Sequence, residues 1–187
     1  MASARDRILD SFVGIVCEDG ERVATLDAVA ARAGVSKGGL LYHFGSKAAL
    51  VTGLCERLSD LAGIDVERMR EAEEGPARYF VRGSQYIGSE LDLALLASAR
   101  LQQAGYEEAK RTLDETEDAW LETLVDALGD VPTAQAIKLM GDGLYHAAAL
   151  GIAAGGDPDA AAGRPEGVDM VALLEVVDRV VDARPTA

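Results

Sequence analysis

Apolar residues recur along the first fifty residues at the three- and four-residue spacing of amphipathic helices. The first such segment ends near Gly20, a residue suited to the left-handed conformation that stops a helix. Thr25 is placed to cap a second helix that ends at Gly34, and Ser36 caps a third only two residues later. The apolar face of the first helix holds Ile8, Phe12 and either Ile15 or Val16, with Leu9 beside them.

Two short helices joined by a tight glycine-containing turn are typical of a helix-turn-helix. Phe44 and Gly45 close this segment, and Ser46 is placed to cap a fourth helix. That helix carries a leucine stripe that runs away from the N-terminal head and indicates a connector, at Leu50, Leu54, Leu58 and Leu61.

Helical patterns continue through the rest of the chain. Gly75-Pro76 breaks the pattern and starts a new helix, because proline fits the first helical turn. Further helices are expected at roughly 76–88, 90–104, 107–128, 132–154 and 168–183. A stretch rich in glycine, proline and alanine at 155–167 is expected to be a loop. The last helix has an apolar face so wide that it needs a partner.

The pattern therefore predicts an all-α protein with two parts. Residues 1–48 are expected to form a three-helix helix-turn-helix domain, and residues 49–187 a second domain that is a helical bundle. Only 5% of the residues are aromatic, which favours helices over a sandwich or barrel. Two cysteines far apart and no run of about 18 apolar residues lead us to expect a cytoplasmic protein without a membrane span, bound metal or cofactor.

The net charge of −14 is distributed unevenly. Residues 1–50 hold six bases and six acids, so the remainder of the chain carries the whole negative charge. A neutral head on an acidic body is compatible with a protein that contacts a polyanion with one end only.

The start of the third helix has the chemistry of a DNA contact. Its N-terminal turn presents backbone N–H groups to phosphate, and small residues there allow close approach to the major groove. Hydroxyl and ammonium groups suited to phosphate oxygens surround Gly38 and Gly39. The expected DNA-binding residues are Thr25, Ser36, Lys37, Gly38, Gly39, Tyr42, His43 and Lys47.

In this register, residues 8–54 resemble the DNA-binding domain of the tetracycline-repressor (TetR) family of bacterial regulators. The positions that carry the resemblance are the run Thr25–Gly38, then Leu40, Tyr42-His43-Phe44, Ser46-Lys47 and Leu50. The resemblance implies a DNA-binding head on a larger helical body that dimerises and holds a pocket for a small effector. Tyr42 stands one position after the place where the family often has an aromatic residue.

The body offers larger side chains as candidate effector contacts. A pocket made from them would be mostly apolar with a few hydrogen-bonding groups, suited to an uncharged or cationic organic molecule. The candidates are Tyr79, Tyr86, Gln102, Trp120, Met140, Tyr145 and His146. Each of them is also a possible core residue.

Other functional classes are less well supported. An enzyme would need a nucleophile, base or metal set, but there are only two histidines and no zinc-protease, P-loop or serine-hydrolase motif. A helical module that binds only proteins explains the amphipathic helices equally well. It leaves the Ser36-Lys37-Gly38-Gly39 sequence and the following Tyr42 without a reason.

The sequence thus predicts a homodimeric repressor that binds a palindromic operator and is released by a small effector. The last two helices are expected to form the dimer interface. Small residues at Gly141 and Gly143 and the alanines at 147–149 would let two penultimate helices approach closely. On this prediction, Val177→Asp on the last helix should split the dimer.

Overall fold

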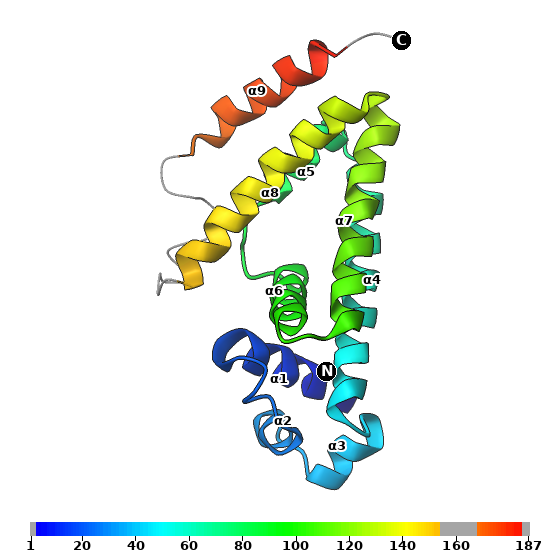
Figure 1. Ribbon diagram of the computed structural model, residues 1–187, viewed down its shortest axis with the longest axis vertical. Helices are drawn as coiled ribbons and strands as arrows, with labels where there is room; N and C mark the ends of the chain where they lie inside the picture. Colours follow the sequence, from blue (N-terminus) through cyan, green and yellow to red (C-terminus); the bar gives the residue numbers. More distant parts are fainter. Residues whose placement is uncertain (1–2, 154–167, 185–187) are drawn as a thin grey trace. The chain divides into compact units, whose positions relative to one another are not determined.

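The computed structural model describes residues 3–153 and 168–184, which contain nine helices and no strand (Figure 1). The expected all-α class is confirmed. The expected loop at 155–167 lies outside the described residues. The helices are α1 (Ala4–Asp19), α2 (Leu26–Ala33), α3 (Lys37–His43), α4 (Lys47–Arg70), α5 (Pro76–Gly83), α6 (Glu90–Gln103), α7 (Glu107–Leu128), α8 (Val131–Ala153) and α9 (Met170–Asp182).

The helix-turn-helix segment begins and ends where its capping residues predict. The Thr25 hydroxyl accepts a hydrogen bond from the Ala28 N–H at 3.2 Å, and the Ser36 hydroxyl accepts one from the Gly39 N–H at 3.0 Å. Gly34 ends α2 with a φ of 65°, in the left-handed conformation that glycine adopts at little cost. The turn between α2 and α3 is therefore fixed by local chemistry.

Helix α5 is shorter than expected. The pattern predicts a helix to residue 88, but α5 ends at Gly83. Gly83 has no side chain to shield its backbone, and the next glycine, Gly88, has a φ of 70° that an α-helix does not accommodate. The six residues from Ser84 to Ser89 therefore connect α5 to α6 without continuing the helix.

The chain forms two compact units, and each is discontinuous in sequence. The first unit consists of Met1–Ala62 and Glu90–Thr116, and the second of Gly63–Ser89 and Glu117–Ala187. The predicted boundary at residue 48 falls near the start of α4, and the first unit also includes α6. Helices α4 and α7 each contribute residues to both units.

The core of the first unit lies between α1 and the helices around it. Small residues on α6, namely Ala94 and Ala97, are buried and allow α6 to pack against α1. The Arg100 guanidinium donates to the Val16 carbonyl at 3.1 Å, at the C-terminal end of α1. Fully buried side chains in this core include Ile8, Phe12, Leu40, Leu50, Leu54 and Leu101.

The second unit packs α5 against α8 and α9. The Arg78 guanidinium joins α5 to α9 through the Asp178 carboxylate at 2.6 Å. A side chain at Gly141 of α8 would meet Ser84 Oγ at 2.6 Å and would overlap the Phe80 ring. The small residue at 141 therefore brings α8 close to α5 of the same chain, and the expected role of Gly141 across a dimer axis is wrong.

Val177 also has a different place from the one expected. It is fully buried within the second unit. Val177→Asp would therefore bury a carboxylate in the core of one protomer, so it is not a clean test of dimerisation. Large apolar side chains exposed on α8 and α9 are found instead at Leu139 and Val171.

Candidate functional site

The face formed by the start of α2 and by α3 is open to solvent. The residues expected to contact DNA are exposed along it, except Gly39 and Lys47, which are half-buried. Tyr42 is 86% exposed and has the His43 ring edge-on at 5.1 Å between centroids. An aromatic side chain this exposed has no role in packing its own domain. The exposed members of the set are Thr25, Ser36, Lys37, Gly38, Tyr42 and His43.

The two adjacent glycines differ in their surroundings. A side chain built at Gly38 would meet nothing within 4 Å, whereas one at Gly39 would lie 3.3 Å from the capping Ser36 Oγ. Glycine inside a helix costs about 1 kcal/mol relative to alanine. Packing within the protein therefore gives no reason for a glycine at position 38.

Lys37 forms an exposed ion pair with Asp27 on α2, at 2.9 Å between Nζ and Oδ1. Both side chains are more than half exposed. Exposed pairs of this kind contribute between zero and about 1 kcal/mol because water competes for both charges. The Lys37 ammonium can therefore exchange its carboxylate partner for another anion.

Lys47 is held more firmly than Lys37. Its ammonium donates to the Glu21 carboxylate at 2.6 Å and to the Glu21 carbonyl at 2.7 Å. The Tyr106 hydroxyl donates to the same carboxylate at 2.9 Å. Hydrogen bonds from Lys47 and then Tyr106 lower the pKa of Glu21 below its ordinary value. The turn before α2, the start of α4 and the turn before α7 thus meet at one carboxylate.

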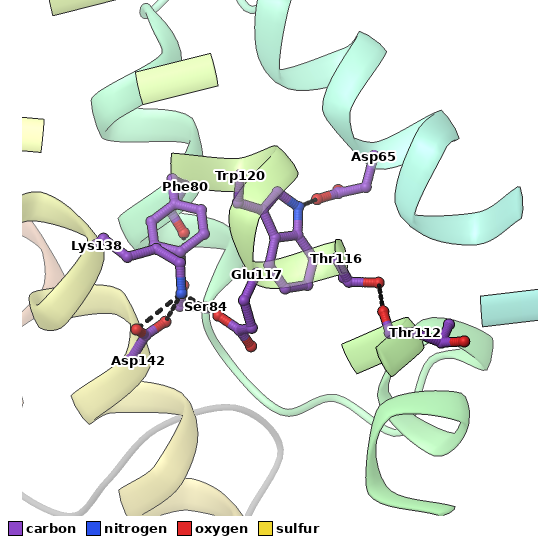
Figure 2. A network of polar contacts seen from close by, with 9 residues as sticks. All are labelled: Asp65, Phe80, Ser84, Thr112, Thr116, Glu117, Trp120, Lys138 and Asp142. Carbon is purple, nitrogen blue, oxygen red and sulfur yellow. Dashed lines mark hydrogen bonds and ion pairs between the residues drawn. The ribbon is translucent and has the colours of Figure 1, made fainter. Parts of the chain in front are cut away.

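A cluster of polar and aromatic side chains in the second unit surrounds Lys138 of α8 (Figure 2). The Lys138 ammonium pairs with the Glu117 carboxylate of α7 and with both oxygens of Asp142, at 2.7 and 2.8 Å. It also lies 5.6 Å from the Phe80 ring centroid and 5.9 Å from that of Trp120. A single buried ammonium therefore faces two carboxylates and two aromatic rings.

Asp65 of α4 organises the other side of Trp120. Its carboxylate accepts the Trp120 indole N–H at 3.0 Å and the Tyr79 hydroxyl at 2.8 Å (Figure 2 shows the indole contact). Burial, and then the hydrogen bond to Asp65, raises the pKa of Tyr79 to about 12. Tyr79 is thus a neutral donor near neutral pH.

The predicted effector residues are only partly brought together. Tyr79 and Trp120 share Asp65, and the Tyr86 and Tyr145 rings lie 6.1 Å apart. Met140 is half-buried on α8, His146 is exposed there, and Gln102 is exposed in the first unit.

Sequence reasoning missed the charged members of the Lys138 cluster. The available signal was the four-residue spacing of Lys138 and Asp142, which places both on one face of α8. Lys138 is also the only lysine after Lys110 in the sequence. The missed residues are Asp65, Glu117, Lys138 and Asp142.

None of the helices in the described part of the chain is both long and apolar enough to cross a membrane. Within the same ranges, no group of three or more His, Cys, Asp or Glu residues is arranged to hold a metal ion.

Comparison with known proteins links the head to one family. Residues 18–54 match the sequence profile described as "Bacterial regulatory proteins, tetR family". No curated protein sequence matches the chain significantly.

Solved structures share the fold over nearly the whole chain. A putative TetR-family transcriptional regulator from Rhodococcus sp. has a TM-score of 0.67 at 22% identity, covering 96% of this chain and 100% of its own. The multidrug binding protein EbrR, complexed with malachite green, has a TM-score of 0.66 at 20% identity and covers 94% of this chain and 96% of its own. The TetR-family regulator PfmR from Thermus thermophilus has a TM-score of 0.64 at 17% identity, with 100% of both chains covered.

Proposed function

We propose that the chain is a transcriptional regulator of the TetR family, whose sequence profile matches residues 18–54, and that it acts as a homodimeric repressor released from DNA by a small organic effector. The observation that carries the DNA-binding part is the exposed face of α3. There the capped helix start, an unpacked Gly38 and the exposed Tyr42 lie together. Neither the unpacked Gly38 nor the exposed Tyr42 serves the packing of the head itself.

The proposed contact places α3 in the major groove. The N-terminal turn of α3 and the Ser36, Lys37 and Tyr42 side chains then reach phosphate oxygens, while Gly38 allows the helix to approach the base edges. Two heads of a dimer would enter successive major grooves about 34–36 Å apart on a roughly palindromic operator.

The proposed dimer uses the exposed apolar residues of α8 and α9. Leu139 on α8 and Val171 on α9 are each 70% exposed. In a dimer with a two-fold axis, the same surface of each protomer faces its partner. The exposed side chains of both protomers would therefore be covered together.

The proposed effector binds the second unit, where most of the candidate aromatic residues lie. EbrR, a structure with the same fold, is complexed with malachite green. An effector releases DNA only if it binds the DNA-incompetent arrangement of the dimer more tightly than the competent one.

The first test is a fluorescence-anisotropy titration of the protein against duplex DNA from its own upstream intergenic region. A shuffled duplex and two salt concentrations provide the comparison. We expect tighter binding to the native duplex and weaker binding at the higher salt. Absence of binding to both duplexes at low salt, before and after removal of retained ligands by refolding, would favour the protein-interaction module instead.

We predict that Lys47→Ala weakens binding to every duplex sequence. If Lys47 leaves Glu21 to contact a phosphate, the loss should reduce the slope of log K against log salt by about 1 in each head. The measurement is the anisotropy titration repeated at four salt concentrations. An unchanged slope would remove Lys47 from the DNA contacts.

Two further variants separate the phosphate contact from a structural effect. Glu21→Gln keeps Lys47 and removes the charge that competes for it, so this variant should bind DNA more tightly than the wild type. Lys110→Ala removes an exposed lysine that pairs with Asp114 in the same unit and should leave both affinity and slope unchanged.

A further inference from the structure

Lys138 occupies a site whose parts are suited to a positively charged group. Its side chain is only 9% exposed, yet its ammonium faces the Phe80 and Trp120 rings as well as two carboxylates. Aromatic faces attract cations through the negative potential of the ring, and carboxylates add charge. The four surrounding groups come from α5, α7 and α8.

One side of this cluster is open to solvent. The Glu117 side chain is 47% exposed and that of Asp142 is 43% exposed, although the ammonium between them is buried. Figure 2 shows the Lys138 amine directed toward both carboxylates, with the Phe80 ring beside it. A molecule that arrives from solvent therefore meets the carboxylates first and the aromatic rings behind them.

The net charge of the second unit also favours a cation over an anion. The residues of the second unit include eighteen acids and eight bases, a net charge of −10. Within the cluster, one ammonium faces two carboxylates, so a negative charge is left over. Anions are disfavoured at this site, and cations are attracted to it.

We infer that this cluster is the binding site for an organic cation, whose positive group takes the place of the Lys138 ammonium between Phe80, Trp120, Glu117 and Asp142. The inference rests on the proposed function, because it names the chemical class of the effector.

An organic cation is favoured over a metal ion by the groups present. Calcium and magnesium require six or more oxygen ligands, whereas two of the four groups here are aromatic rings. A quaternary or delocalised cation is weakly hydrated, so it loses less solvation on entering than the ammonium of lysine. The flexible stem of Lys138 allows its ammonium to move out to water.

Trp120 makes the site directly observable, because it is the only tryptophan in the sequence. The experiment titrates the full-length protein with phenyltrimethylammonium and follows tryptophan fluorescence excited at a wavelength that selects the indole. The neutral isostere tert-butylbenzene and the anion benzenesulfonate are the matched controls. We expect a saturable change with the cation at an affinity at least tenfold above that of either control.

The Lys138→Ala variant distinguishes a cluster that binds a ligand from one that is only an internal ion pair. Removing the resident ammonium should tighten phenyltrimethylammonium binding at least tenfold, and the cation should raise the melting temperature of this variant more than that of the wild type. A purely structural lysine would give a variant that is destabilised and does not respond to the cation. Lys138→Met, which keeps the volume of the stem, repeats the test if the alanine variant does not fold.

The outcomes also distinguish this inference from the proposed function. No fluorescence response to the cation, or an equal response to benzenesulfonate, overturns the inference, and DNA binding by the same preparation would leave the regulator assignment intact. A cation response that Lys138→Ala strengthens supports the inference even if the cation does not release DNA. In that case only the proposed effector release would fail.

Discussion

Replacing Leu139 with aspartate should convert the protein to a monomer and reduce operator affinity at least a hundredfold. The two-fold axis of the proposed dimer would bury the new carboxylate twice, once from each protomer, at a cost of several kcal/mol. Without the dimer, each head binds its half-site alone. Sedimentation equilibrium at low micromolar protein and anisotropy with operator duplex measure the two effects, and Val171→Asp should behave in the same way.

Two control variants define what a failed prediction would mean. Ile64→Asp places the same charge on a half-exposed residue of α4 in the same unit and should leave both the dimer and DNA binding unchanged. Val177→Asp should instead lower the melting temperature, because Val177 is fully buried within the protomer. If Leu139→Asp and Val171→Asp both remain dimeric, the interface does not involve these faces of α8 and α9.

The parts of the fold that the sequence predicted are those fixed by near neighbours. Thr25 and Ser36 cap their helices through the N–H group three residues later, so the same short stretch contains both partners. The left-handed Gly34 is likewise set by its own backbone. The TetR-family match covers this same local region.

The parts that were missed depend on residues far apart in the chain. Lys47 meets Glu21 across 26 residues, and Tyr106 reaches the same carboxylate across 85. No helical period encodes such a meeting, so the lysine was expected only at phosphate. The Lys138 cluster poses the same difficulty, because Glu117 lies on a different helix from Lys138.

Small residues on a helix predict that another helix packs closely against it, but they do not indicate which helix that is. The glycines of α8 were expected to bring two copies of the chain together, but Gly141 lies against Phe80 of α5 and against Ser84, the residue that follows α5. Sequence periodicity reports only which residues share a helical face. It does not report whether the facing helix belongs to the same chain or to another.

The two glycines of α8 offer a matched pair for testing this packing. Gly141→Ala should lower the free energy of unfolding by about 1–3 kcal/mol, because its Cβ would overlap the Phe80 ring and lie 2.6 Å from Ser84 Oγ. Gly143→Ala should raise it by up to about 1 kcal/mol, because a Cβ there meets nothing within 4 Å and alanine is the better helix former. Equilibrium unfolding in urea measures both values, provided that the variants and the wild type lose free energy of unfolding with urea concentration at the same slope.

Trp120 fluorescence also reports whether these two glycine variants disturb the Lys138 cluster. The Phe80 and Trp120 rings lie 6.0 Å apart, so a Phe80 ring displaced in the Gly141→Ala variant should alter the folded-state tryptophan emission as well as the unfolding midpoint. Gly143→Ala should leave that emission unchanged. If both variants stabilise the protein and neither changes the emission, α8 and α5 are farther apart than described, and the Lys138 cluster loses the close packing on which its aromatic side depends.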